Sequence, residues 1–484
     1  MTRLRFNSVN IALPVQKFDI RCHVSLERSV PVMTEFAIRL LYTVGKMQLE
    51  QIRDYFGLSN HEVRQLISIL RAENLVEEEG DYLFLSDYAI TRFESSTGDN
   101  PRFTAIVERR NSVSFELLTF QYLPRDLQFS HSSCAVELKA GRDDDFENTI
   151  ERAEKAYYDQ FHDIERLVRT EEQKRAFGVY KIGEVTAGRR INLAYPVHFE
   201  YDTNDGRIEQ VFDEQLDLAP KLRERLESLV ADTVHQGRLT DGEAVFDFAK
   251  RFGDELIKRF IHPGGFDLAR YISQVHVEKS VAYESEDTLP LFGSIYLPEN
   301  VKFLSRQIRI GVTKYRESHK GTRIEPTLLW LAPASELWGR TKLLGDAIEE
   351  FTSTGRGALD NKRFGVPVVR QIEPRLVKRE RATNGDAGIL DLICCGRKAE
   401  FARYEVIVLP DVLAVGLCYV GIPSTEGSVA PIGFVTTNSA RIKELESILG
   451  EVLSGVHSRN RCERREGKFE ETSVSSADFA YLGS

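Results

Sequence analysis

The chain has 484 residues, 42% hydrophobic and 29% charged, with a formal net charge of −10. These values predict a globular protein of several domains and argue against a general coat for nucleic acid, although local patches can carry the opposite sign. We expect no membrane span, because no apolar run reaches about 18 residues and the N-terminal stretch lacks the apolar centre of a signal peptide. The six cysteines have no metal-binding spacing, which favours a reducing cytoplasm.

Residues 1–33 look extended, and we expect them to pack against another domain. From Thr34 to Gly45 apolar side chains recur every three to four residues, which is the helix period. Two further runs of this kind follow, one ending at Gly57 and one beginning after Ser59, and these residues are typical helix stop and start signals. Residues 74–86 then predict a two-stranded wing with its turn near Gly80.

This order of elements over 34–94 resembles the winged helix-turn-helix domains of bacterial transcription regulators. The best match is QLEQIRDYFGLSNHEVRQLISILRAENLVEEEGDYLFLS. In DNA-binding members, the start of the third helix faces base edges in the major groove. Arg can read guanine there, and Asn or Gln can read adenine. The resemblance implies base contacts from Asn60, His61, Arg64 and Gln65, and phosphate contacts from Arg71 or Arg92.

The charge of this segment does not suit a DNA-binding domain. Residues 34–94 contain six Lys or Arg and eleven Asp or Glu, a net charge of 6 − 11 = −5. Phosphate contacts need cations, yet Glu77, Glu78 and Glu79 lie at the entry to the wing. Three interpretations remain at this point: a module that docks a protein or dimerises, a DNA-binding domain, or an inert spacer.

A linker is expected at 95–101, which is rich in turn-forming residues. Residues 102–265 then read as an α+β module without a familiar motif. Its expected strands are 115–122, 134–138, 179–185 and 191–201, with a hairpin turn at Asp205-Gly206. Its expected helices are 143–175, 214–235 and 242–260.

Residues 266–455 read as an α/β domain, followed by a flexible tail over 456–484. The expected strands are 327–331, 366–371, 388–394, 404–409, 412–416, 417–420 and 432–435. The expected helices are 337–351 and 439–453, the second capped by Asn438. The whole chain is therefore predicted to be an α+β multidomain protein, with an N-terminal winged helix, a central α+β module and a C-terminal α/β domain.

One part of this last domain, RYEVIVLPDVLAVGLCYVGI over 403–422, is similar to the second half of a phospholipase D-type domain. That family carries a nucleophilic His and a phosphate-binding Lys before a strand, an Asp turn and a strand that ends in Gly. Here Arg403 and Glu405 occupy the His and Lys places, the Asp falls one residue late at Asp411, and Gly416 stands at the strand end. The resemblance implies a degenerate, non-catalytic copy. The alternative is an unrelated α/β sheet with a β-hairpin.

A basic stretch covers 361–381, with seven Lys or Arg against two Glu, a balance of 7 − 2 = +5. Such a stretch could bind a nucleic-acid backbone or a phosphorylated ligand. A solvated loop, or a face paired with acidic domains, is an equally good interpretation. Its cations are Lys362, Arg363, Arg370, Arg375, Lys378, Arg379 and Arg381.

These features favour a cytoplasmic bacterial sensor, regulator or recognition protein without catalysis of its own. It would dock DNA or a protein through the winged helix and sense a ligand or partner through the C-terminal domain, and it could serve an antiphage defence system. We expect a protein partner or homo-oligomer, with nucleic acid as an alternative, and no metal or cofactor. One rival is a divergent metal-dependent nuclease or phosphodiesterase that uses Asp386, Asp391 and Glu405. A second rival is a structural scaffold subunit.

Overall fold

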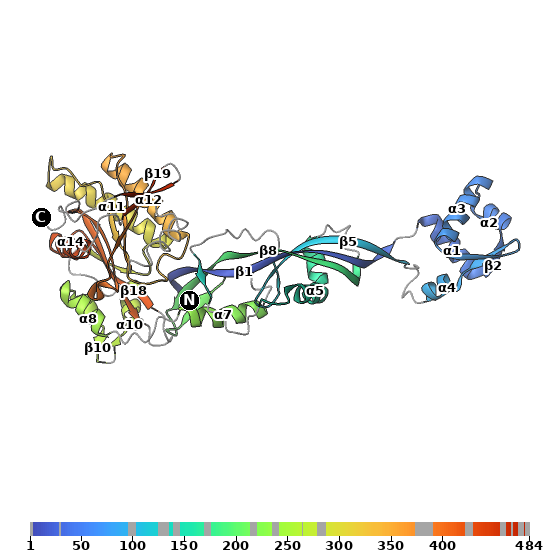
Figure 1. The fold of residues 1–484 in the computed structure, drawn as a ribbon, viewed down its shortest axis with the longest axis horizontal. Helices are drawn as coiled ribbons and strands as arrows, with labels where there is room; N and C mark the ends of the chain where they lie inside the picture. Colours follow the sequence, from blue (N-terminus) through green and yellow to red (C-terminus); the bar gives the residue numbers. More distant parts are fainter. Residues whose placement is uncertain are drawn as a thin grey trace. The chain divides into compact units, whose positions relative to one another are not determined.

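A computed structural model describes residues 3–28, 31–94, 103–123, 135–138, 146–168, 176–212, 220–234, 242–263, 265–277, 287–372, 391–421, 429–454, 461–465, 468–472 and 479. The chain divides into two compact units. Unit 1 comprises 1–15, 128–145 and 191–484, and unit 2 comprises 16–127 and 146–190. Strands β1 (Arg3–Arg28) and β8 (Ala176–Asp202) contribute residues to both (Figure 1). The structure is of the mixed α+β class, as predicted.

Within unit 2, residues 32–94 form a small module of helices around a three-stranded sheet with the order β2-β4-β3. The elements are α1 (Val32–Val44), β2 (Lys46–Gln48), α2 (Leu49–Phe56), α3 (Asn60–Ala72), β3 (Val76–Glu79), β4 (Tyr82–Leu85) and α4 (Asp87–Glu94). The structure therefore contains three helices and a two-stranded hairpin where the sequence predicted them. Strand β2 was not predicted.

Local sequence explains where these elements begin and end. Ser59 caps α3 by accepting from the backbone N–H of Glu62, while the Glu62 carboxylate accepts from the N–H of Ser59 at 2.8 Å. This capping box satisfies donors that a helix start leaves free. Gly57 and Gly80 have positive φ of 64° and 61°, which glycine adopts without steric cost at a helix end and a tight turn.

The rest of unit 2 is a sheet with the order β6-β5-β1-β8. Alternate residues of β1, from Phe18 to Val24, point into a core with residues of β5 and two helices, as the period of two in a strand requires. The opposite face of the sheet is polar. The further elements are β5 (Phe103–Glu116), β6 (Tyr122–Leu123), α5 (Thr149–Asp159) and α6 (Phe161–Val168).

Two predictions for this region were wrong. The single helix expected over 143–175 is two helices that meet at Gln160, whose side-chain amide donates to the Phe120 carbonyl at 2.8 Å and accepts from the Tyr122 N–H at 2.9 Å. The two strands expected over 179–201 are one strand, which passes through Gly188. That glycine lets the backbones approach closely, since a Cβ there would lie 3.1 Å from the carbonyl oxygen of Lys17. The linker at 95–101 lies outside the described residues.

Unit 1 is built on a sheet with the order β12-β18-β17-β16-β13-β14-β15-β19-β20. Pairings β13 with β14 and β14 with β15 are parallel, and the other pairs for which register is resolved are antiparallel. The strands are β12 (Thr288–Phe292), β13 (Leu329–Leu331), β14 (Val368–Gln371), β15 (Asp391–Cys395), β16 (Tyr404–Leu409), β17 (Leu413–Gly421), β18 (Val429–Thr436), β19 (Arg461–Arg465) and β20 (Lys468–Thr472).

Helices contact both faces of this sheet. α11 (Pro298–Ser318) and α12 (Leu343–Leu359) share one buried cluster with Trp330, Ile407 and Val415. α14 (Ser439–Leu453), capped by Asn438 as predicted, and α8 (Gly242–Arg251) contact β16 and β17. Sheets with parallel strands are usually covered on both faces in this way. Among the described residues, no helix is both long and apolar enough to span a bilayer.

Shorter elements complete unit 1. They are β7 (Val136–Glu137), β9 (Ile208–Val211), α7 (Pro220–Val234), α9 (Glu255–Lys258), β10 (Ile261–His262), β11 (Gly265–Phe266), α10 (Leu268–Ile272), a π-helix (Ser273–Val277) and a 3-10 helix (Ala399–Phe401). The helix expected over 242–260 ends at Arg251, because Gly253 takes a φ of +57° and Asp254 caps a new turn.

Two further expectations differ from the structure of unit 1. The helix expected at 337–351 begins instead at Leu343, because Gly339 takes a φ of +72° and Trp338 turns into the core. The segment expected to be a flexible tail contains the hairpin β19–β20, whose first strand pairs with β15. That pairing gives hydrogen-bond partners to a strand edge that would otherwise be open.

Candidate functional site

The residues predicted to read bases lie together on the exposed side of α3. This helix buries Val63 and Leu66 against the module core. The Oδ1 atom of Asn60 accepts a hydrogen bond from Arg53 at 3.1 Å. The side-chain carbonyl of Asn60 is therefore already engaged within the module. The structure thus brings the four together on the first turns of one helix. The four exposed residues are Asn60, His61, Arg64 and Gln65.

Most other cations of this module are engaged with neighbouring side chains. Arg39 and Arg53 each pair with an acid on their own helix at 2.8 Å. The ammonium of Lys46 lies 5.2 Å from the centre of the Tyr82 ring. Arg64 has no ion pair among the described residues. The face of α3 therefore offers one unneutralised positive charge.

Arg71, predicted to contact phosphate, is held by strand β3. Its guanidinium pairs with Glu78 on β3, and this hydrogen bond raises the pKa of Arg71. The two side chains line a pocket of about 450 Å³ together with Glu50 and Asp81. Three carboxylates against one guanidinium leave this pocket negative, so it repels a phosphate backbone.

The basic stretch at 361–381 does not form one surface over its described residues. Lys362 and Arg363 are exposed in the turn after α12. Arg370 is only 2% exposed, because all four residues of β14 are buried in the sheet. It donates to the Ser335 carbonyl at 3.2 Å, and its guanidinium lies 5.1 Å from the Trp338 ring. The other predicted binding residues, Arg375, Lys378, Arg379 and Arg381, lie outside the described residues.

Glu405 lies at the centre of a fully buried polar cluster. Its Oε1 accepts from the indole Nε1 of Trp330 and of Trp338, each at 2.9 Å. Its Oε2 accepts from the hydroxyl of Tyr419 at 2.8 Å. These donors come from β13, from the loop before α12 and from β17, while Glu405 is on β16. Hydrogen bonds satisfy this buried carboxyl as interiors require, and the chain has only these two tryptophans.

The environment of Glu405 changes its acidity. Burial raises the pKa of its carboxyl from 4.5 to about 7, against the opposing effects of the Tyr419, Trp338 and Trp330 hydrogen bonds and the positive charge of Arg370. Desolvation outweighs these favourable contacts because a carboxylate loses its hydration in the core. Glu405 therefore changes protonation near neutral pH although it is 0% exposed.

A second polar cluster in unit 1 lies beside the first one. Asn7 on β1 accepts from the hydroxyls of Ser294 and Tyr296 at 3.1 and 2.9 Å. Burial raises the pKa of Tyr419, as do the neighbouring Glu405 and Tyr296. Tyr296 therefore donates a hydrogen bond to the first strand of the chain and also raises the pKa of Tyr419.

The positions matched to the phospholipase D-type motif have structural roles here. Asp411 forms the turn between β16 and β17 with a φ of +59°, and its N–H donates to Glu446 at 3.0 Å. Gly416 allows close packing, since a Cβ there would lie 3.2 Å from Leu445. Within the described ranges, no group of three or more His, Cys, Asp or Glu residues could hold a metal ion. Of the carboxylates proposed for a nuclease, Asp386 lies outside those ranges.

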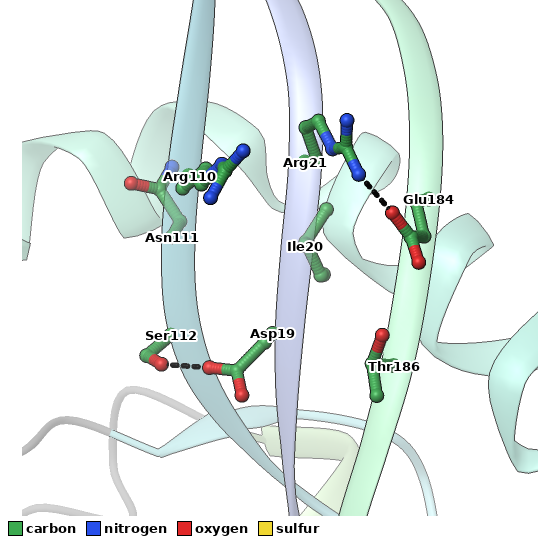
Figure 2. A pocket seen from close by; sticks show the side chains of 8 residues that line it. All are labelled: Asp19, Ile20, Arg21, Arg110, Asn111, Ser112, Glu184 and Thr186. Carbon is green, nitrogen blue, oxygen red and sulfur yellow. Dashed lines mark hydrogen bonds and ion pairs between the residues drawn. The ribbon is translucent and has the colours of Figure 1, made fainter.

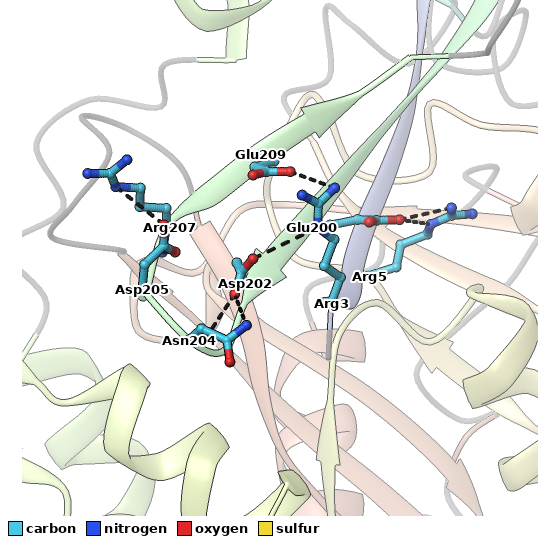
Figure 3. Close-up of polar contacts among 8 residues, drawn as sticks. All are labelled: Arg3, Arg5, Glu200, Asp202, Asn204, Asp205, Arg207 and Glu209. Carbon is cyan, nitrogen blue, oxygen red and sulfur yellow. Dashed lines mark hydrogen bonds and ion pairs between the residues drawn. The ribbon is translucent and has the colours of Figure 1, made fainter. Parts of the chain in front are cut away.

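Two polar surfaces carry paired charges of both signs. In unit 2, a pocket of about 440 Å³ lies over β5, β1 and β8, where Arg21 pairs with Glu184 and Ser112 with Asp19 (Figure 2). In unit 1, ion pairs join the start of β1 to β8 and β9 (Figure 3). Opposite charges this close cancel at a distance, so neither surface selects a charged ligand by its net field.

The sequence alone did not reveal the Glu405 cluster. Trp330 and Trp338 flank Pro333 in the sequence, but no sequence feature linked them to Glu405. The only signal was a lone Glu within the apolar run Tyr404–Leu409, since such a charge needs partners when it is buried. Comparison with protein-family models, curated proteins and solved structures gave no significant match.

Proposed function

We propose that this chain is a recognition protein without catalysis of its own. In this proposal, residues 32–94 are a winged helix that docks a partner protein, and residues 266–455 are a phospholipase D-like domain that has lost its catalytic groups. The observation that carries the proposal is the burial of Glu405. The resemblance implies a catalytic Lys at this position. The chain instead has the buried carboxyl of Glu405, which accepts hydrogen bonds from three side chains.

The loss of chemistry follows from accessibility and charge. A nucleophile or metal ligand must reach substrate, but Glu405 is 0% exposed. A negative group there would also repel the phosphate that a catalytic Lys attracts. Arg403, at the place of the catalytic His, carries a guanidinium group, which cannot act as a nucleophile. In this proposal, the domain has no catalytic role and binds a partner through its surface.

The order of elements in 32–94 supports the winged-helix assignment. The segment has four helices and a three-stranded sheet, and in this proposal the hairpin of β3 and β4 is the wing. The negative wing and the ion pair between Arg71 and Glu78 favour a basic protein surface over DNA as the partner. The face that docks is expected to include Gln65 and Glu77.

Site-specific photocrosslinking tests this docking. A photoreactive residue is placed at Gln65 in the full chain within cells of its source, and a control is placed at Tyr180, which is 69% exposed outside the module. We expect a discrete protein adduct from position 65 that position 180 does not give. Equal adduct patterns from both positions, or adducts with DNA alone, contradict the proposal.

Sequence-specific DNA binding is the second candidate, because the exposed start of α3 carries residues suited to base edges. Fluorescence polarisation with random duplex DNA at low and moderate salt separates the two. Protein docking predicts no binding at low salt. Tight binding that weakens steeply with salt and is lost in Arg64→Ala favours DNA.

A further inference from the structure

The outer side of α1 carries a row of uncovered apolar side chains. Val32, Phe36 and Val44 are 66%, 54% and 54% exposed, and Leu40 between them is half-buried. More than half of the large hydrophobic side chains that are exposed among the described residues belong to the module of 32–94. We call Val32, Phe36, Leu40 and Val44 the outer row.

The outer row is separate from the face that α1 buries. Ala37, Ile38 and Leu41 fill the module core, so the core does not account for a second apolar stripe. Residues four apart on a helix form one continuous ridge. A contiguous exposed apolar ridge is a typical protein interface.

The spacing of the row identifies what covers it. We propose that α1 packs antiparallel against α1 of a second copy of this chain. The two-fold axis passes the exposed side of α1 at the level of residue 38. It places Phe36 of one copy against Leu40 of the other, and Val32 against Val44. A two-fold interface requires a surface that complements itself, and this row is apolar at every place that the symmetry pairs.

The charges beside the row are complementary under the same symmetry. Glu35 and Arg39 flank it and form an ion pair within the helix at 2.8 Å. In an antiparallel pair, the acidic half of one flank meets the basic half of the other, so Glu35 lies near Arg39 of the second copy.

The size of the interface sets its strength. The helix has 13 residues, or about 20 Å of length at 1.5 Å per residue. Two helices of this length bury less than a standard stable interface, so we expect dimerisation in the micromolar range. The pairing leaves the exposed face of α3 free and does not depend on the function proposed above.

Analytical ultracentrifugation of the full chain tests the pairing over about 1 to 200 micromolar. We expect the wild type to change from monomer to dimer over this range, and Phe36→Glu to remain monomeric throughout. The matched control is Tyr55→Glu, which adds the same charge at a residue 67% exposed on α2, and it should dimerise like the wild type. A monomeric wild type, or a Phe36→Glu dimer of unchanged affinity, overturns the proposal.

A charge exchange distinguishes pairing of α1 with itself from contact with another surface. Glu35→Arg and Arg39→Glu each place like charges within one helix and across the dimer, so each alone should dimerise at least tenfold more weakly than the wild type. Mixed together, the two variants should form a heterodimer with near wild-type affinity, because opposite charges then face each other only between chains. If mixing gives no heterodimer, the antiparallel pairing is wrong even where the wild type dimerises.

Discussion

Replacing Glu405 by Gln removes the one buried charge of the Trp330–Trp338–Tyr419 cluster while keeping its shape. The Gln carbonyl can still accept from both indoles, and its amide can donate to the Tyr419 oxygen. The variant therefore isolates the effect of protonation from the effect of packing. We expect it to fold like the wild type but to lose the dependence of stability on pH that Glu405 confers.

The magnitude follows from the pKa of Glu405, which burial raises from 4.5 to about 7. The folded state holds the proton more tightly than the unfolded state, so the stabilising contribution is complete below pH 4.5 and is lost as the pH rises through 7. A difference of one pKa unit corresponds to about 1.4 kcal/mol. The wild type should therefore lose about 3 kcal/mol of unfolding free energy relative to Glu405→Gln across this window.

Urea unfolding followed by tryptophan fluorescence measures this difference directly. The only two tryptophans of the chain both donate to Glu405, so the signal reports on the cluster itself. Glu255→Gln serves as the control, because it removes a carboxylate whose side chain is 72% exposed. Wild-type and Glu405→Gln curves that stay parallel from pH 4.5 to 8 would refute the reasoning.

Three further predictions concern stability and can be checked by the same urea titration. Gly355→Ala should cost about 2 kcal/mol, because a Cβ there would lie 2.1 Å from the Phe364 ring, whereas Gly357→Ala on the same helix meets nothing within 4 Å and should be neutral or slightly stabilising. Equal effects would contradict the packing of α12. Arg441→Ala removes the cation 3.2 Å from the fully buried Asp254 and should cost about 3 kcal/mol, and a loss below about 1 kcal/mol would mean that the pair is not needed. Ser59→Ala removes the cap of α3 and should cost about 1 kcal/mol in the module, and no change would show that the cap is dispensable.

Local signals in the sequence predicted the elements of the small module. Ser59 and Glu62 are three residues apart and Gly57 and Gly80 mark turns, so each feature is set by near neighbours. Strands β16 and β18 and helix α14 were also predicted from local patterns, but the two strands expected over 412–416 and 417–420 are the single strand β17. Register and partner strands followed only from the structure.

The Glu405 cluster could not be predicted because its donors are distant in sequence. Trp330 is 75 residues from Glu405 and Trp338 is 67 residues away, and only the strand order brings them together. Arg370 was assigned to a basic surface because its sequence neighbours are basic. Its place in the buried strand β14 turns it inward, which a local charge count cannot detect.

The central claim is that this chain recognises a partner without performing chemistry on it. Its most direct test is hydrolysis of single- and double-stranded DNA, of RNA and of a chromogenic phosphodiester by the purified full chain with magnesium or manganese. We expect rates equal to those without protein, for the wild type and for Glu405→Gln alike. Metal-dependent cleavage by the wild type that disappears in Glu405→Gln or Asp391→Asn would contradict it.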